Sequence, residues 1–282
     1  MVNINDSVLE RFIDEDVPYI DLTSHILGIE EQSGSISYIA RENICVCGTE
    51  EVKKIFDKYD LEVLNYKRSG TFLKKGEVLL QAKGRADALH LVWKVCVNIL
   101  ENASGVATRV QKFVESAKDV NPKVEIVTTR KIFPGTKQLA TKAVLVGGAY
   151  PHRLGLGESI LVFEEHLRFY GGLDKFIDNL KELKQKACEK MIAVEAHNIE
   201  DALKLAKANV DIIQLDKFSI EDLKTAVKQI KEISPNTRIS AAGGINMQNV
   251  KEISACGADL LVTSSLYFGK PADIKADIQL LR

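Results

Sequence analysis

The sequence predicts an α/β protein that contains an incomplete or small parallel β/α barrel. Three observations lead to this fold class. From about residue 120 onward, short apolar runs that end in polar residues or glycine alternate with segments of helical periodicity. Six such runs are present, fewer than the eight strands of a closed barrel. No G-x-G-x-x-G follows the first run, which disfavours a doubly wound dinucleotide-binding sheet.

The six runs are nearly all apolar, as expected for strands that are buried on both faces of a parallel sheet. They cover residues 124–129, 159–163, 191–196, 211–216, 238–244 and 259–265. Apolar residues at helical spacing predict helices over 173–187, 199–208, 220–233 and 247–255. Residues of the type that caps helix N-termini precede three of these helices: Asn198, Ser219 and Asn246.

The pattern differs before residue 108. Residues 70–84 have the pattern of a strand, a turn and a second strand, and residues 86–102 that of a long helix. Gly105 is predicted to separate this helix from the next one, over residues 106–118. We therefore expect a separate N-terminal α+β domain that precedes the barrel.

Composition excludes several functional classes. The 282 residues include 38 basic and 39 acidic side chains, so the net charge of −1 favours neither nucleic acid nor an anionic membrane as a partner. No apolar stretch has the length of a membrane span or of a signal peptide, which predicts a cytoplasmic protein. Five scattered cysteines without a CxxC pair favour reduced thiols in or near the core.

Cationic side chains follow the first predicted strand. In a parallel barrel the strand carboxyl ends and the loops after them carry the site, so the residues at those positions indicate the ligand. Arg130 and Lys131 follow the first strand and precede the turn Pro134-Gly135. His152 and Arg153 lie on a glycine-rich loop before the second strand, and Glu164 and His166 follow that strand. These cations predict a local pocket for an anion.

Acidic and glycine residues end the later strands. Glu195 and Asp216 end the third and fourth strands, and suit either a divalent cation such as Mg²⁺ or ribose hydroxyls. Gly243-Gly244 ends the fifth strand, and Ser264-Ser265 ends the sixth. These two loops fit the phosphate site that barrels often build from their last two loops and a helix N-terminus.

Four segments together resemble a known family. They are residues 85–108, TTRKIFPGTKQLATKAVLVGGAYPHRLGL (128–156), VEAHNIEDALKLAKANVDIIQLDKFS (194–219) and ISAAGGINMQNVKEISACGADLLV (239–262). They resemble the quinolinate phosphoribosyltransferases, or carboxylating nicotinate-nucleotide pyrophosphorylases, over nearly the whole chain. Within this family, FPGTK, GGAYPHRLGLGES and LVFEEH are similar to the ModD branch, which is associated with molybdenum transport.

The resemblance implies the type II phosphoribosyltransferase fold. An N-terminal α/β sandwich domain (1–108) is joined by the C-terminal residues 269–282, and an open α/β barrel (109–268) forms the catalytic domain. The resemblance also implies a homodimer whose site is shared across the interface, and a reaction that uses Mg²⁺. Phosphoribose passes from phosphoribosyl pyrophosphate to quinolinate, giving nicotinate mononucleotide, CO₂ and pyrophosphate. The partners are then small anionic substrates.

The resemblance also assigns roles to residues. It implies catalytic roles for Glu195, Asp216 and Lys131, with both acids near the metal. Gly243 and Gly244 match the phosphate loop of the family. Ser264 and Ser265 are added as phosphate-binding residues because they end the neighbouring sixth strand. The substrate-binding residues are Lys94, Arg130, His152, Arg153, Phe163 and His166.

Several positions depart from the family pattern. Phe163 replaces a lysine of the cationic pocket, and Lys94 replaces an arginine, which keeps the charge but loses the bidentate fork. Ala193 and His197 replace two glutamates, and Phe268 replaces a late histidine. The pocket is thereby less cationic and more aromatic, which favours a different, monoanionic aromatic acceptor as the alternative to quinolinate.

Two other functional classes compete with a phosphoribosyltransferase. The first is a non-catalytic anion-binding protein of molybdate uptake. The carboxylates of Glu195 and Asp216 at the strand ends disfavour this function, because they repel anions. The second is an aldolase-like barrel enzyme with a Schiff-base lysine, for which Lys131 and Lys217 are the candidates.

Overall fold

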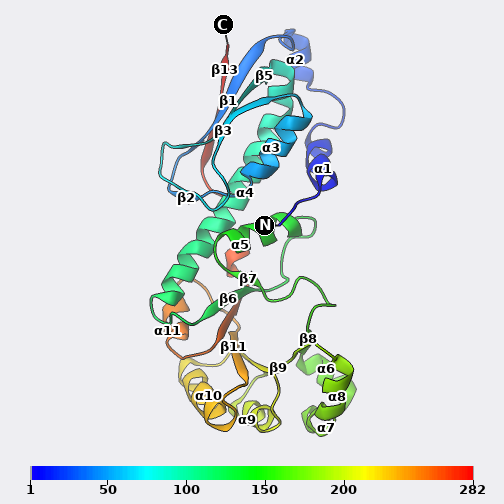
Figure 1. The fold of residues 1–282 in the computed structure, drawn as a ribbon, viewed down its shortest axis with the longest axis vertical. Coiled ribbons are helices and arrows are strands. Elements are labelled where there is room, and N and C mark those ends of the chain that lie inside the picture. The colour runs from blue at the N-terminus through cyan, green and yellow to red at the C-terminus, as the bar shows by residue number, and fades with distance from the viewer. Residues whose placement is uncertain (1, 282) are drawn as a thin grey trace. The chain divides into compact units, whose positions relative to one another are not determined.

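The computed structural model describes residues 2–281, which divide into two compact units (Figure 1). The first unit comprises residues up to 111 together with 133–148 and 267 onward, and the second comprises residues 112–132 and 149–266. The predicted α/β fold class is confirmed: one unit holds an antiparallel sheet with helices, and the other holds a parallel sheet. None of the helices in residues 2–281 has the length and apolar character needed to cross a membrane.

The first unit is a four-stranded antiparallel sheet covered by helices. Its strand order is β13-β1-β5-β3, so the last strand of the chain pairs with the first one. Alternate residues of β1, among them Ile36 and Tyr38, are buried against α3, α4 and the other strands. The elements are α1 (Asp6–Asp16), α2 (Leu22–Leu27), β1 (Ser33–Ala40), β2 (Ile44–Cys45), α3 (Thr49–Lys58), β3 (Glu62–Tyr66), β4 (Phe72–Leu73), β5 (Val78–Arg85), α4 (Ala86–Lys118), α5 (Lys137–Val146) and β13 (Ile274–Leu280).

One prediction for this part of the chain is confirmed and one was wrong. Residues 70–84 form a strand, a turn and a second strand, β4 and β5, of which β4 pairs with β2 and β5 lies between β1 and β3. Gly105 does not break a helix but lies inside the continuous helix α4. A Cβ at this position would lie 2.9 Å from the backbone nitrogen of Ala272, so glycine here allows the C-terminal segment to pack closely on α4.

The second unit contains the predicted parallel sheet, in the order β7-β6-β12-β11-β10-β9-β8, with β7 and β8 as its edges. Its central strands are buried along nearly their whole length, which explains their apolar sequence. The elements are β6 (Glu125–Thr128), β7 (Tyr150–Pro151), β8 (Ile160–Val162), α6 (Glu164–Tyr170), α7 (Leu173–Asp178), α8 (Leu180–Ala187), β9 (Ile192–Ala196), α9 (Ile199–Lys207), β10 (Ile212–Asp216), α10 (Ile220–Ile233), β11 (Arg238–Ala242), α11 (Val250–Ser254), β12 (Leu260–Thr263) and the 3-10 turn Ser265–Tyr267.

Two of the three predicted helix caps are confirmed. The side chains of Asn198 and Ser219 accept hydrogen bonds from backbone N–H groups in the first turns of α9 and α10. The side chain of Asn246 instead accepts a hydrogen bond from the backbone N–H of Gln248, and α11 begins only at Val250. Asn246 therefore opens a turn that precedes the helix, because the chain leaves β11 through an extended glycine loop.

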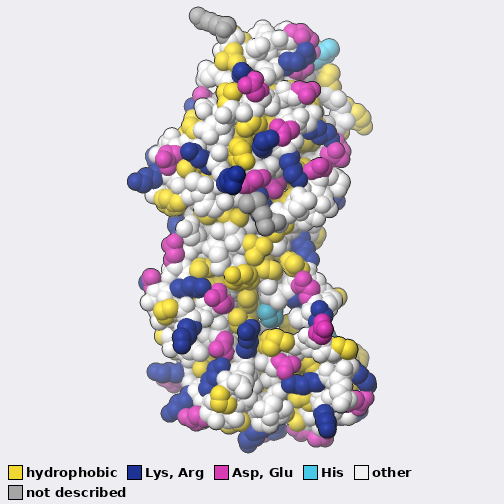
Figure 2. All heavy atoms as spheres, viewed as in Figure 1, with side chains coloured by type: hydrophobic (Ala, Val, Ile, Leu, Met, Phe, Trp, Pro, Cys, Tyr) yellow, Lys and Arg dark blue, Asp and Glu magenta, His cyan; other side chains and the backbone are white. Residues whose placement is uncertain are grey.

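The remaining differences are at element boundaries and at the cysteines. The helix predicted over 173–187 is divided at Asn179 into α7 and α8. None of the five cysteines forms a disulfide in the described part of the chain, and four are buried, whereas Cys188 is exposed. On the face shown in Figure 2, basic and acidic side chains are intermixed, in agreement with the balanced net charge.

Candidate active site at the carboxyl edge of the parallel sheet

An acidic cluster lies where β9 and β10 end. The two strands are parallel neighbours, and Gln214 lies opposite Glu195 in their register. The Nε2 of Gln214 donates a hydrogen bond of 3.0 Å to Oε1 of Glu195. The imidazole of His197 lies between the two acids, with Nε2 3.3 Å from Oε2 of Glu195 and Nδ1 3.9 Å from Oδ2 of Asp216. The predicted pair Glu195 and Asp216 is thus close enough to share one ligand.

The environment of Glu195 favours a bound cation. Burial raises the pKa of Glu195, and the negative charge of Asp216 raises it further, against the hydrogen bond from Gln214. The side chains of Glu195 and Asp216 are only 11% and 15% exposed, so water screens their repulsion weakly. A cation or a set of hydroxyl donors at this position would stabilise both ionised carboxylates.

The loop after β11 passes close to the end of β10. Gly243 and Gly244 have φ angles of +93° and +70°, values that residues with a side chain rarely adopt. A Cβ on Gly243 would lie 2.7 Å from the backbone nitrogen of Lys217 and 3.0 Å from Oδ1 of Asp216. Glycine at position 243 therefore allows the loop to lie directly against the acidic cluster.

A hydrogen bond joins the loop after β11 to the end of β12. Thr263 Oγ1 donates to the carbonyl of Ile245 at 2.7 Å and accepts from the backbone N–H of Ser265 at 3.1 Å. Since β11 and β12 are neighbouring strands, Ser264 and Ser265 lie on the loop adjacent to the glycine pair. The predicted contribution of a helix N-terminus is not supported, because α11 has five residues and starts six residues after Gly244.

A cluster of cations lies at the β7 edge of the sheet. The two-residue strand β7, which the sequence analysis missed, pairs with β6, and the backbone N–H of His152 donates to the carbonyl of Thr128 at 2.9 Å. This pairing places His152 and Arg153 beside the residues that follow β6, Arg130 and Lys131. Within residues 2–281 no carboxylate lies at ion-pair distance from either arginine or from Lys131.

The pKa shifts in this cluster agree with unneutralised positive charge. Burial lowers the pKa of Arg153, and the charge of Arg130 lowers it further. Burial likewise lowers the pKa of His152, with a second contribution from Arg153. An anion bound here would relieve the repulsion among these cations. The arrangement therefore suits the anion pocket that the sequence predicts at this edge.

Phe163 and His166 form an aromatic pair at the end of β8. Their rings stack with centroids 5.6 Å apart and an interplanar angle of 20°. The Nδ1 of His166 accepts a hydrogen bond of 3.0 Å from the backbone N–H of Phe163, which fixes the ring and leaves Nε2 as the possible donor. This part of the sheet edge offers a planar apolar surface where the family pattern has a lysine.

Lys94 belongs to the first unit, as does Phe268. Lys94 lies on α4 with its Nζ 5.0 Å from the centroid of the Trp93 ring. Phe268 is exposed and packs edge-on against Tyr267. These two residues are therefore not among the side chains that the second unit places at the candidate site.

Sequence reasoning missed Gln214 and the role of His197 beside the acids. The signal was present, because side chains two residues apart in a strand point to the same face. Glu195 and His197 are such a pair, as are Gln214 and Asp216 on the adjacent strand. A glutamine inside the apolar strand DIIQLD is itself a sign of a buried polar partner.

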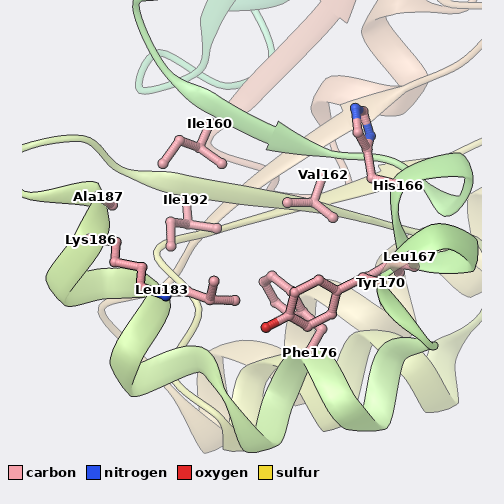
Figure 3. Close-up of a pocket in the computed structure, with 10 residues that line it drawn as sticks. All are labelled: Ile160, Val162, His166, Leu167, Tyr170, Phe176, Leu183, Lys186, Ala187 and Ile192. Carbon is pink, nitrogen blue, oxygen red and sulfur yellow. The ribbon is translucent and has the colours of Figure 1, made fainter.

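A separate cavity of about 280 Å³ lies between β8, β9 and helices α6 to α8 (Figure 3). It is not the candidate active site. Ile192 of β9 lines the cavity, and Glu195, three residues later, points to the opposite face of the sheet. The ring of His166 points away from the apolar side chains in Figure 3. The other lining residues are Ile160, Val162, Leu167, Tyr170, Phe176, Leu183, Lys186 and Ala187.

Comparison with known families decides the assignment. Residues 21–104 match the model of the N-terminal domain of quinolinate phosphoribosyl transferase, and residues 106–277 match the model of its C-terminal domain. The chain belongs to the quinolinate phosphoribosyl transferase family. Together the two models cover most of the chain, so membership extends to both units.

Individual relatives agree with this assignment. A protein of Pasteurella multocida that carries the name pyrophosphorylase ModD is 38% identical over 99% of each chain. A relative from Archaeoglobus fulgidus, named as a nicotinate-nucleotide pyrophosphorylase (carboxylating), is 29% identical over 91% of this chain and 96% of its own. The crystal structure of nicotinate-nucleotide pyrophosphorylase from Ehrlichia chaffeensis superposes with a TM-score of 0.90, at 26% identity over 99% of this chain and 100% of that one.

The predictions of family, ModD similarity and enzyme class are confirmed by these findings. As a family member, the chain is a phosphoribosyltransferase, which is a pentosyl-transferring enzyme. Both the ModD proteins and the nicotinate-nucleotide pyrophosphorylases are similar to it, so similarity does not select the acceptor.

Proposed function

We propose that this phosphoribosyltransferase transfers phosphoribose from phosphoribosyl pyrophosphate to a ring nitrogen of an aromatic acid, with pyrophosphate as the leaving group. The observation that carries the proposal is the division of one sheet edge into two halves. Acids and glycine loops lie at β9 to β12, whereas cations without carboxylate partners lie at β6 and β7. The first half suits a phosphorylated sugar, and the second suits a carboxylate.

At the donor half, Glu195 and Asp216 are proposed to hold the ribose hydroxyls and Mg²⁺. The two carboxylates lie close enough together for one divalent cation, and their mutual repulsion favours it. Bound Mg²⁺ would neutralise charge on the pyrophosphate. Phosphate oxygens are proposed to bind the loops that contain Gly243, Gly244, Ser264 and Ser265. A Cβ on Gly244 would meet no atom within 4 Å, so the space beside this position is open.

At the acceptor half, Arg130, Lys131, His152 and Arg153 are proposed to bind the carboxylate of the acceptor. Lys131 is exposed, and we assign to it the further role of stabilising negative charge that develops on the departing pyrophosphate. Quinolinate is the default acceptor of the family. The stacked pair Phe163 and His166 supports an aromatic acid with a single carboxylate as the alternative.

We further propose that the active form is a homodimer in which the partner subunit's Lys94 completes the acceptor pocket. A lysine there supplies charge without the bidentate geometry of an arginine. Sedimentation at working concentrations tests the assembly, and a monomer that retains full activity would remove Lys94 from the site.

The role of Arg130 is tested by replacing it with alanine. Loss of a charge-assisted hydrogen bond to a carboxylate costs about 1.5–3 kcal/mol, so we expect kcat/KM for the acceptor to fall on the order of 10- to 100-fold. The matched control is Arg238→Ala, because Arg238 is an exposed arginine at the opposite end of the same sheet. Steady-state pyrophosphate release measures both variants. If kcat/KM falls equally in both, Arg130 does not bind the acceptor.

The role of Phe163 is tested by Phe163→Lys. A cation at this position should favour a dicarboxylate over a monocarboxylate, and we expect their kcat/KM ratio to rise on the order of tenfold. Phe169→Lys is the control, because it introduces the same charge at a residue of α6 that is 96% exposed and does not belong to the stacked pair. An unchanged ratio in Phe163→Lys would mean that this residue does not select the acceptor.

A non-catalytic anion-binding protein is the second candidate function. The unneutralised cations at β6 and β7 favour it, and the acids at β9 and β10 count against it. Calorimetric titration of the purified protein with phosphoribosyl pyrophosphate and Mg²⁺ separates the two. Binding of that donor supports the enzyme, whereas binding of molybdate alone would support the second function.

A further inference from the structure

The cluster at the ends of β9 and β10 contains a nitrogen donor as well as two carboxylates. One oxygen from each of Glu195 and Asp216 and one nitrogen of His197 lie within 4.8 Å of one another. The imidazole is the most accessible of the three, with 43% of its side chain exposed, compared with 11% for Glu195 and 15% for Asp216. A small rotation of this accessible ring would direct one nitrogen to a cation held by the two less exposed carboxylates.

Gln214 holds one of these carboxylates in place. This side chain is 5% exposed, and its amide nitrogen donates to Oε1 of Glu195 at 3.0 Å. The other carboxylate oxygen, Oε2, faces His197. Hydrogen bonds of this kind orient the ligands of metal sites and tune their affinity. The cluster thus has three donor groups and a buried residue that orients one of them.

We propose that Glu195, His197 and Asp216 form a three-ligand site that binds a first-row transition-metal dication, such as Co²⁺, Mn²⁺ or Zn²⁺, more tightly than Mg²⁺. The inference rests on the proposed metal role of the two acids and adds His197 as a ligand. Mg²⁺ strongly prefers oxygen donors and retains its water molecules, whereas imidazole is a favourable ligand for transition metals. A donor set of two carboxylates and one imidazole therefore selects by ligand type.

The competing arrangement is a protonated His197 that serves as the counter-ion of both acids. Its two nitrogens face different carboxylates, Nε2 toward Glu195 and Nδ1 toward Asp216, which is the geometry of a bridging ion pair. In that arrangement removal of the imidazole would leave the carboxylates free to bind any dication, and transition-metal affinity would stay equal or rise. The two arrangements thus predict opposite effects of removing the imidazole.

Metal binding is measured on the full chain after removal of metal with a chelator, in the absence of phosphoribosyl pyrophosphate. Co²⁺ is followed by its visible absorption, Mn²⁺ by electron paramagnetic resonance, and Mg²⁺ by competition with Mn²⁺. We expect Co²⁺ to bind at least tenfold more tightly than Mg²⁺. In His197→Gln the Co²⁺ affinity should fall on the order of 10- to 100-fold, with a much smaller change for Mg²⁺.

Three further variants sharpen the test. His197→Glu replaces the imidazole with an oxygen donor, so the preference for Co²⁺ over Mg²⁺ should shrink. Gln214→Leu should weaken Co²⁺ binding by losing the orientation of Glu195. His25→Gln is the matched control, because His25 is an exposed histidine of α2 in the first unit and should leave both affinities unchanged. Thermal melts confirm that each variant is folded.

A spectroscopic readout tests ligation directly. Pulsed electron paramagnetic resonance of the Mn²⁺-loaded protein should show a coupled imidazole nitrogen that is lost in His197→Gln and retained in His25→Gln. Co²⁺ binding that is no tighter than Mg²⁺ binding, or that is insensitive to His197→Gln, would overturn the inference.

The result is separable from the proposed function. Pyrophosphate release with Mg²⁺, together with Co²⁺ binding that does not depend on His197, would preserve the transferase and reject the three-ligand site. If Co²⁺ binding depends on His197 but no acceptor leads to pyrophosphate release, the three-ligand site is supported and the proposed transferase function is rejected.

Discussion

Asp216→Asn is expected to lower the rate of pyrophosphate release by about 10²–10³-fold, the usual cost of removing one preorganised charged or polar group from an active site. The asparagine keeps the shape of the side chain but removes its negative charge. In the proposed site this charge acts together with that of Glu195 to bind the ribose hydroxyls and the metal. The side chain is only 15% exposed, so water cannot readily take its place. Initial rates with saturating donor measure the effect.

Glu232→Gln is the matched control for this variant. It also removes one negative charge, but Glu232 is exposed near the end of α10 and follows no strand. The control should retain the wild-type rate. If Asp216→Asn also retains it, the acids of β9 and β10 are not part of the catalytic site, and stronger binding of simple anions by that variant would favour the anion-binding protein.

Lys142→Met is expected to lower the free energy of unfolding by about 3–5 kcal/mol, the usual cost of removing one partner of a buried ion pair. Lys142 is 1% exposed on α5, and its Nζ lies 2.8 Å from Glu50 and 2.5 Å from Glu51. All three residues belong to the first unit. Methionine fills similar space but leaves two carboxylates without their cation. Urea denaturation measures the loss.

The matched control is Lys53→Met, which breaks an exposed pair with Asp57 on α3 and should cost less than about 1 kcal/mol. The triple change of Lys142→Met with Glu50→Gln and Glu51→Gln should recover much of the stability, because it removes the unpaired charges. A Lys142→Met protein as stable as Lys53→Met would show that the buried cluster does not stabilise the fold.

The same cluster gives stability a dependence on acidic pH. Burial tends to raise the pKa of Glu50, but hydrogen bonds from Lys142 and Ser69 outweigh it and hold the pKa at about 2, against an ordinary value of 4.5. A carboxyl group whose pKa is lowered in the folded state contributes stability above its unfolded pKa and loses it as the pH falls toward the folded value. The wild-type protein should therefore lose stability between about pH 4.5 and 2 more steeply than Lys142→Met.

The parallel sheet and its functional edge were predictable from the sequence because two simple patterns coincide there. Strands buried on both faces require apolar runs, and residues 211–216 and 238–242 have that character. The polar residues that end these runs meet at one edge because parallel strands share a direction. For this reason the proximity of Glu195 and Asp216 could be expected from the amino-acid sequence.

The features that sequence reasoning missed depend on packing between distant segments. Gly105 resembles a helix break, yet it is required where the C-terminal segment approaches α4. The strand β7 has two residues, too few to show a periodicity. The spacing of two residues marks Glu195 with His197, and Gln214 with Asp216, as same-face pairs, but the contacts between β9 and β10 depend on a register that is not visible in either strand alone.

The most direct test of the account is pyrophosphate release from phosphoribosyl pyrophosphate and Mg²⁺ with a panel of acceptors. The panel contains quinolinate, pyridine monocarboxylates and other aromatic acids, and mass spectrometry identifies each product. The account predicts release with at least one acid, formation of its phosphoribosyl adduct, and loss of both in Asp216→Asn. The proposed function would be contradicted if a folded dimeric protein released no pyrophosphate with any acid and bound phosphoribosyl pyrophosphate weakly or not at all.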